Sequence, residues 1–279
     1  MKKSTSYLGI LVSIIILSCS KGGDDAKITL TDAKFCIQID ALKMDICNII
    51  GEQEAITYAF PTTDSEISEV SACATVTRSP LPGTAITVGQ LITKSINFGT
   101  GCTLNSGNIV SGKIIISYVY ETNSGAHHFV NFSFDNFYHN GIKIDGDNIT
   151  KRIPTTATTE INMTLFLTLA NGDRYQSVTD WNRMTVQGFN TLTLVDDVYT
   201  FNGNSVILRP DNIILENVIL PELKVKMSCE VNKPEIVSGV ITIDRDTGQG
   251  ATINFGQGSC NNIASVTVLG ENHDVFLRN

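Results

Sequence analysis

The chain has 279 residues, of which 28 are acidic and 20 are basic, so its formal net charge at pH 7 is −8. These charges are scattered and form no basic stripe, which argues against nucleic acid as a partner. After residue 18 no apolar run approaches the roughly 20 residues that a membrane-spanning helix needs, so we expect no such helix there.

The first residues have the pattern of a secretion signal. Lys2 and Lys3 precede an apolar stretch, Tyr7–Leu17, which is shorter than a membrane-spanning helix. A basic start, a short apolar core and a small residue before the cleavage point are typical of a signal peptide. We therefore expect residues 1–18 to be removed on export.

The end of this signal resembles the lipobox of bacterial lipoproteins. Ile16 to Cys19 read ILSC, with Ser18 as the small residue before the cut. The resemblance implies that Cys19 carries lipid, becomes the first residue of the mature chain and anchors it to a membrane. Two or more acyl chains anchor a protein stably, whereas one chain alone is marginal. The alternative is an ordinary signal peptide with an incidental cysteine.

Residues 19–27 are predicted to be a lipidated tether. Ser20 to Asp25 are small, flexible and then acidic, a composition that holds a domain away from the membrane. They also resemble the short acidic export signal of surface lipoproteins of the Bacteroidota. The resemblance implies attachment to the outer membrane with display at the cell surface. Attachment facing the periplasm is the alternative.

Residues 28–72 are expected to be a partly helical N-terminal segment. Thr29 or Thr31 can cap a helix, and helix-favouring residues follow. We predict one or two helical segments between Thr31 and about Phe60, and a loop over Pro61–Ser71. The apolar positions form only a partial helical stripe, made of Ile37, Ile39, Leu42, Ile46 and Ile49.

Residues 73–279 are predicted to form an antiparallel β domain. In Ile161–Leu169 the apolar residues fall on odd positions, and Val130, Phe132 and Phe134 alternate with polar residues in the same way. Period-2 alternation rich in Thr, Val, Ile and Phe is typical of strands with one packed and one wet face. The expected fold class is mainly β: a meander, elongated or sandwich-like, with a short helical N-terminal segment.

Three Asn-Gly dipeptides occur where hairpin turns are expected. Asn140-Gly141, Asn171-Gly172 and Asn202-Gly203 follow one another at intervals of 31 residues. Asn-Gly suits a two-residue hairpin because both central residues need positive φ. The equal spacing predicts a regular meander whose turns return to the same edge.

Two cysteine-bounded repeat units, residues 73–118 and 229–279, flank this meander. Ser95–Cys102 (SINFGTGC) is echoed by Thr252–Cys260 (TINFGQGSC). Each segment closes an interval that another cysteine opens. The two units are therefore expected to close in the same way.

The repeat predicts two disulfides, Cys73–Cys102 and Cys229–Cys260. Of the seven cysteines Cys19 is assigned to lipid, and the even number that remains in an exported chain favours disulfides. Zinc is not favoured because the sequence has no Cys-x-x-Cys or Cys/His cluster. We expect each pair to face across an antiparallel hairpin, within disulfide distance.

The last two cysteines, Cys36 and Cys47, fall in the predicted helical segment. On one straight helix they would lie about 16 Å apart, too far for a disulfide. We expect free thiols, or a bond between them only if the helix breaks.

Six segments of the β region carry a further resemblance: Cys73–Thr77, the two INFG segments, Phe132–Phe137, Asn140–Gly146 and Gly256–Asn262. They resemble a family of uncharacterised Bacteroidota lipoproteins whose members carry runs similar to VTFDNFxVNGxKVEG and DFGxGxCDN. The match covers Cys73 to Leu277 in order. It departs at Asn261, where the family usually has Asp, and near Trp181, where the family's charged run is reduced. The resemblance implies no catalytic residue.

The sequence has no catalytic or metal-binding motif that we recognise. The histidines do not form a metal-ligand pattern, and adjacent His127 and His128 on a strand would point to opposite faces, so we interpret them as a solvated strand end. Neither a nucleophile elbow nor a phosphate-binding glycine loop occurs. We therefore expect no cofactor and no bound metal. The other two histidines are His139 and His273.

Two weaker patterns, a possible calcium loop and a possible aromatic sugar platform, also have structural interpretations. Asp145–Asn148 and Asp244–Gly248 offer alternating oxygen ligands but lack the distal glutamate of a calcium loop, so we interpret both as acidic hairpin turns. Aromatic pairs could stack on a sugar, but with only 7% aromatic residues, core or cross-strand packing is the preferred interpretation. The pairs are Trp181 with Tyr175 and Phe137 with Tyr138.

We expect a non-catalytic protein, held to the membrane through Cys19, with a structural, adhesive or ligand-binding role. The possible ligand, a glycan or a protein, is not identified by the sequence. The alternative is an extracellular glycan-acting enzyme with paired carboxylates, or a carbohydrate-binding module. Two carboxylates about 5–10 Å apart in an aromatic-lined cleft would favour the enzyme. A flat sheet face rich in Thr and Asn would favour the scaffold.

Overall fold

The computed structural model describes residues 27–59, 73–121, 128–189, 191, 193–229, 233–245 and 250–277. The predicted signal peptide, Cys19, most of the tether and the predicted loop over Pro61–Ser71 lie outside these residues. Within the described part of the chain, no helix combines the length and the apolar character needed to cross a lipid bilayer.

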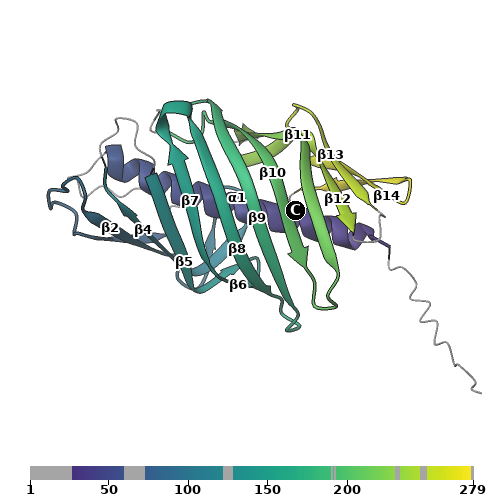
Figure 1. The fold of residues 1–279 in the computed structure, drawn as a ribbon, viewed down its shortest axis with the longest axis horizontal. Coiled ribbons are helices and arrows are strands. Elements are labelled where there is room, and N and C mark those ends of the chain that lie inside the picture. The colour runs from purple at the N-terminus through teal and green to yellow at the C-terminus, as the bar shows by residue number, and fades with distance from the viewer. Residues whose placement is uncertain are drawn as a thin grey trace, which may run out of the picture.

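Among the described residues one α-helix, α1 (Leu30–Ala59), runs through the interior of the molecule (Figure 1), and one short 3-10 helix, η1 (Pro154–Thr156), follows β7 (Asp147–Ile153). It begins with a reciprocal cap, in which the Asp32 backbone N–H donates to Thr29 Oγ1 (3.1 Å) and the Thr29 N–H donates to Asp32 Oδ2 (2.9 Å). In its middle, apolar Ile39 and charged Asp40 are equally buried. Thr31, Lys34 and Gln38 near its start are exposed, but from Ile39 to Glu54 almost every residue is buried. A helix surrounded over most of its length has little solvent-facing side, which explains why its sequence shows only a partial apolar stripe.

The strands of the described residues all belong to one antiparallel sheet. They are β1 (Thr75–Ser79), β2 (Leu91–Asn97), β3 (Cys102–Thr103), β4 (Ile109–Val119), β5 (His128–His139), β6 (Ile142–Asp145), β7 (Asp147–Ile153), β8 (Thr158–Thr168), β9 (Arg174–Gln187), β10 (Val198–Leu208), β11 (Ile214–Cys229), β12 (Lys233–Arg245), β13 (Ala251–Gln257), β14 (Ile263–Val268) and β15 (Glu271–Phe276).

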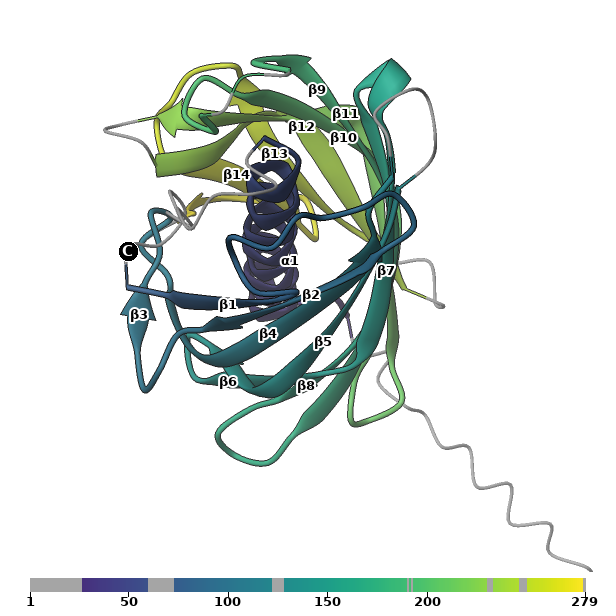
Figure 2. The same ribbon diagram turned by 90° about the vertical axis from the view of Figure 1, so that its left-hand side faces the viewer.

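Strands that are neighbours in the sheet are also close in sequence. The order runs β1-β2-β4-β5-β6-β8 and then consecutively from β9 to β15, with β3 paired to β4 and β7 paired to both β5 and β8. Seen end-on, this sheet curves around the helix (Figure 2). The predicted meander is therefore confirmed, and it forms one sheet rather than a sandwich.

The predicted alternation places the core between the sheet and the helix. In β8 the side chains of Ile161, Met163, Leu165 and Leu167 are buried, and those between them are more exposed. Together with residues of α1 they belong to one hydrophobic core. The mainly β fold class is confirmed. The helix is longer than the short segment expected, at 30 residues, and it fills the inside of the sheet.

One of the three turn predictions is wrong. Asn140 (φ 48°) and Gly141 (φ 79°) form the tight turn between β5 and β6, and the second dipeptide lies in the loop between β8 and β9. Asn202 and Gly203, however, lie inside β10. The pairing with β11 shifts register there, and a Cβ on Gly203 would lie 2.2 Å from the Asp180 carbonyl oxygen. This glycine serves a bulge and a close backbone approach instead of a turn.

Both predicted disulfides are present, with Cα–Cα distances of 5.7 Å for Cys73–Cys102 and 5.4 Å for Cys229–Cys260. The reason given for them was wrong, because neither pair faces across one hairpin. Cys73 precedes β1 and Cys102 opens β3, which pairs with β4. Cys229 ends β11 and Cys260 follows β13, so this bond links elements on either side of β12.

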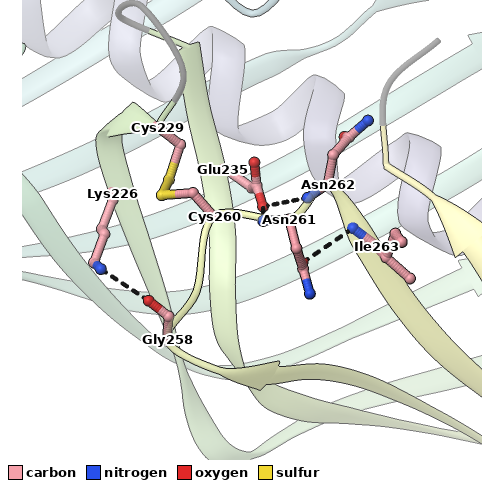
Figure 3. Close-up of a disulfide and its surroundings, with 8 residues drawn as sticks. All are labelled: Lys226, Cys229, Glu235, Gly258, Cys260, Asn261, Asn262 and Ile263. Atoms are coloured by element: carbon pink, nitrogen blue, oxygen red, sulfur yellow. Dashed lines mark hydrogen bonds between the residues drawn. A yellow bond between two sulfur atoms is a disulfide. The ribbon is translucent and has the colours of Figure 1, made fainter.

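Hydrogen bonds hold the loop that carries Cys260 in place (Figure 3). Buried Glu235 of β12 accepts hydrogen bonds from the backbone N–H groups of Asn261 (2.9 Å) and Asn262 (2.7 Å). Lys226 Nζ donates to the Gly258 carbonyl oxygen (2.8 Å). These contacts fix the residues on both sides of Cys260 next to β11 and β12.

Candidate functional site

Helix α1 carries several charged side chains into the core. Burying a charge is costly unless it is paired and hydrogen-bonded, so each of these groups needs a partner. The buried charged residues of the helix are Asp40, Lys43, Asp45, Glu52 and Glu54.

Lys43 and Asp40 form a closed pair. Lys43, with none of its surface exposed, places Nζ 3.0 Å from Asp40 Oδ1 and 4.8 Å from the ring centroid of Trp181. Burial raises the pKa of Asp40, while the ammonium beside it acts in the opposite direction. The Lys43 ammonium is paired with the Asp40 carboxylate and packs on the Trp181 ring, so its role is structural.

Asp45 is satisfied by a second polar cluster. Its Oδ2 accepts hydrogen bonds from Ser106 Oγ (3.0 Å) and Asn108 Nδ2 (2.7 Å), and it lies 2.8 Å from Nε2 of buried His139. Three partners converge on one oxygen, so this carboxylate is held by groups of the protein itself.

The third cluster overturns the interpretation of His128 as part of a solvated strand end. His128 opens β5 and is buried, with Nδ1 3.4 Å from Glu54 Oε1. Arg152 Nη1 lies 3.7 Å from the other oxygen of Glu54. The alternation of β5 places His128 on the same face as buried Val130, and the helix supplies a carboxylate there. His127 lies outside the described residues.

A pocket lies between the C-terminal half of α1 and strands β7 to β10. Its cavity volume is about 80 Å³, and the space reaches about 800 Å³ only when the open solvent at its mouth is included. Five charged side chains contribute to its lining: Glu52, Glu54, Arg152, Arg183 and Asp197. Hydroxyl groups of Thr150, Thr159, Thr185 and Tyr199 also belong to lining residues. The wall is therefore polar in part, and apolar residues such as Ile50, Ile161 and Leu194 complete it.

Arg183 of β9 differs from the other buried cations. Its side chain is 9% exposed, and its Cζ lies 4.7 Å from the ring centroid of Tyr199. Its Nε is buried without a hydrogen-bond partner. Within the described residues the guanidinium forms no ion pair and donates no hydrogen bond. A guanidinium stays charged at any physiological pH, so this site holds a positive charge that has no direct ion pair among the described residues, although the charge interacts with nearby Asp197.

Asp197 directly precedes β10 and lines this pocket. Burial, the largest cause, raises its pKa to about 6 from an ordinary 3.8, although the hydrogen bond from Tyr199 O–H and the nearby Arg183 act in the opposite direction. Burial also raises the pKa of Tyr199, so its hydroxyl group stays protonated and donates a hydrogen bond to Asp197 Oδ2. A Cβ on Gly188 would lie 2.1 Å from Asp197 Oδ1, so the glycine makes room for the carboxyl group.

The cysteines of the helix are free, as predicted for a continuous helix. Cys36 and Cys47 are both buried, and burial raises their pKa values to about 12 and about 11. Cys47 lines the pocket. Because the thiolate is the nucleophilic form, a thiol with such a pKa is inert at neutral pH.

The remaining sequence candidates lie elsewhere. Asp145 ends β6 and Asp147 begins β7, so the first acidic stretch is a break between two strands rather than the hairpin turn we predicted. At the break, a Cβ on Gly146 would lie 2.2 Å from the Thr164 carbonyl oxygen. Part of the second stretch, residues 246–249, lies outside the described residues.

Core packing is the better account of the aromatic pairs. Trp181 and Phe137 are buried, and Trp181 meets Phe201 at a centroid distance of 5.7 Å. Tyr175 packs against Phe35 of the helix, with centroids 4.5 Å apart. The preferred interpretation is therefore confirmed for these three aromatics.

Sequence reasoning missed the pocket, although a signal for it was present. In β9 buried and exposed residues alternate around Trp181, and Arg183 is two positions further along the strand. An inward-facing Trp181 therefore implies an inward-facing arginine. The helix carboxylates gave no comparable signal, because their burial depends on a sheet that surrounds the helix.

Comparison of the chain with protein families, with characterised proteins and with solved structures finds no match.

Proposed function

We propose that this chain is a lipid-anchored protein of the cell envelope whose domain binds a small ligand without transforming it. Lipid on Cys19 would hold it to the outer membrane, with the tether presenting the domain at the cell surface. The observation that carries the binding role is the pocket beside α1, in which Arg183 is buried with its Nε lacking a hydrogen-bond partner and without a direct ion pair among the described residues. Polar groups around a concave site are what fixes a small ligand in place.

The same pocket keeps the glycan-acting enzyme as a second candidate. Asp197 shares the pocket with Glu52 and Glu54, and a carboxyl group with a pKa of about 6 suits a general acid. Against this, Asp197 is enclosed by Gly188 and held by Tyr199. Aromatic side chains are also few at the pocket, where Phe189 and Tyr199 are those that line it. We therefore favour binding over catalysis.

A ligand screen on the purified full chain in a non-ionic detergent tests the binding role. Thermal shift and calorimetric titration would use soluble sugars, amino acids, organic acids and inorganic anions. The blocking variant is Thr159→Trp, which fills the pocket, and its control on the same strand is Asn162→Trp, at an exposed position. We expect at least one ligand to bind the native protein and the control but not the blocked protein. Binding lost only in the control, or release of sugar from glycans, would contradict the proposal.

The anchor is tested separately by Cys19→Ala. We expect this variant to leave the membrane fraction or to accumulate as an uncleaved precursor, because no thiol remains to accept lipid. Protease treatment of intact cells then reports whether the anchored protein is exposed at the surface. Unchanged processing and membrane association of Cys19→Ala would contradict the anchor.

A further inference from the structure

The side chain of Arg183 is held in one place by two neighbours. The ring of Tyr199 lies under its guanidinium, and the α1 backbone comes close at Gly51, where a Cβ would be 3.3 Å from Nη2. A side chain larger than hydrogen at Gly51 would therefore crowd the guanidinium. The flat face of the group is covered by the ring, which leaves the N–H groups at its edge to bind a partner.

The carboxylates of the pocket contact other groups, although Glu54 Oε1 and Asp197 Oδ1 are buried without a hydrogen-bond partner. Glu54 is shared by His128 and Arg152, and Asp197 accepts the hydrogen bond of Tyr199. Glu52 accepts one from Gln53 Nε2 (3.4 Å). No carboxylate of the described residues forms an ion pair with Arg183.

The surroundings of Arg183 suit an oxygen-rich anion. Thr150, Thr159 and Thr185 line the same pocket and carry hydroxyl groups that can donate hydrogen bonds to anionic oxygens. Arg152 adds a second cation to the wall. A guanidinium offers two parallel N–H donors that match the spacing of carboxylate or phosphate oxygens.

From this arrangement we propose that the pocket binds its ligand through a carboxylate or phosphate group, which Arg183 holds by its guanidinium. The inference rests on the proposed binding function and names the chemical class of the ligand. Burial strengthens such a contact, because little water competes for the N–H donors. The limited space of the pocket selects a small molecule rather than a polymer.

Titrations of the full chain with sodium acetate, succinate, phosphate and sulfate test this inference, with sodium chloride at matched ionic strength as the reference. We expect saturable binding of at least one oxyanion. Comparing acetate and succinate with phosphate and sulfate shows whether the pocket prefers a carboxylate or a phosphate-like group. Arg183→Gln should weaken that binding about 10- to 100-fold, since a charged hydrogen-bond donor is lost. Arg183→Lys should keep part of the affinity, because it preserves the charge without the fork.

The matched control is Arg174→Gln, which removes an exposed arginine from the same strand and should leave the affinity unchanged. Equal loss in Arg174→Gln would overturn the inference, because the effect would then reflect net charge. If no oxyanion binds but a neutral or cationic ligand does, and Thr159→Trp blocks it, the inference fails while the proposed function stands. If nothing binds in either screen, both fail.

Discussion

Among the described residues two buried cations lie on aromatic rings, and of these two only Lys43 forms an ion pair. Lys43 Nζ is 4.8 Å from the centroid of Trp181, and Arg183 Cζ is 4.7 Å from that of Tyr199. Lys43 meets Asp40 at 3.0 Å, whereas Arg183 meets no carboxylate of the described residues. The ion pair of the first cluster lies within the helix, while the second cluster opens onto a pocket.

The comparison separates a structural charge from one available for binding. A paired buried charge is destabilising to break, because its partner is left uncompensated in the core. A buried charge without a partner leaves nothing behind when it is removed. Stability measurements on matched variants can therefore tell the two roles apart without knowledge of the ligand.

The largest effect is expected from Lys43→Met. The substitution leaves the Asp40 carboxyl group buried without its cation, so we expect a loss of about 3–5 kcal/mol in the free energy of unfolding at pH 7. Urea denaturation followed by circular dichroism measures it.

Two further variants are the controls for that experiment. The double variant Asp40→Leu/Lys43→Met removes both charges and should be more stable than Lys43→Met alone, because no charge remains uncompensated. Arg183→Met should lose less than about 1 kcal/mol, because no ion partner is left behind. If Arg183→Met were as destabilising as Lys43→Met, the distinction between the clusters would be wrong.

A smaller effect is expected from the pH dependence that Asp197 contributes. Its pKa is about 6 in the folded protein and near 3.8 when the chain is unfolded, so the folded form takes up a proton first as the pH falls. The stabilising contribution is complete below pH 3.8 and is lost as the pH rises through 6. Between pH 7 and pH 5 the gain is about 1 kcal/mol, allowing for screening by solvent at the pocket mouth.

Thermal unfolding of the native protein and of Asp197→Asn across this range measures that contribution. Other groups titrate in both proteins, so the difference between the two curves isolates Asp197. We expect the stability of the native protein to rise relative to that of Asp197→Asn as the pH falls from 7 to 5. Parallel curves would show that Asp197 does not take up its proton in this window.

The strands were predictable from sequence because their signal is local. Alternation in β8 states which side chains face inward, and the tight turn at Asn140-Gly141 needs only its own two residues. Asn202-Gly203 has the same sequence, but its role depends on Asp180 of the neighbouring strand. No local pattern distinguishes a turn glycine from one that lets another backbone approach.

The candidate site was less predictable because it depends on how the sheet surrounds the helix. Glu54 and His128 are far apart in the sequence, and each is an ordinary polar residue until the fold brings them together. Two cysteine pairs could be predicted from repeated intervals, although the hairpin geometry offered for them was wrong. Arg183 was predictable in part. Its position two residues after Trp181 in β9 indicates that its side chain faces inward, but the sequence does not indicate that it lacks an ion pair.

The smallest expected effect comes from Gly51→Ala, and it tests whether the helix backbone fixes the position of Arg183. Alanine favours a helix interior over glycine by about 1 kcal/mol, which stabilises the variant. The added Cβ would lie 3.3 Å from Arg183 Nη2, a tight contact that offsets part of this gain. Making the same substitution in an Arg183→Gln background gives a double-mutant cycle by urea denaturation. We expect Gly51→Ala to raise the free energy of unfolding more in that background than in the native protein. The difference should be about 0.3 kcal/mol, because the shorter glutamine leaves room for the methyl group. Equal gains in both backgrounds would mean that Gly51 does not hold the guanidinium, and Tyr199 would then be its main support.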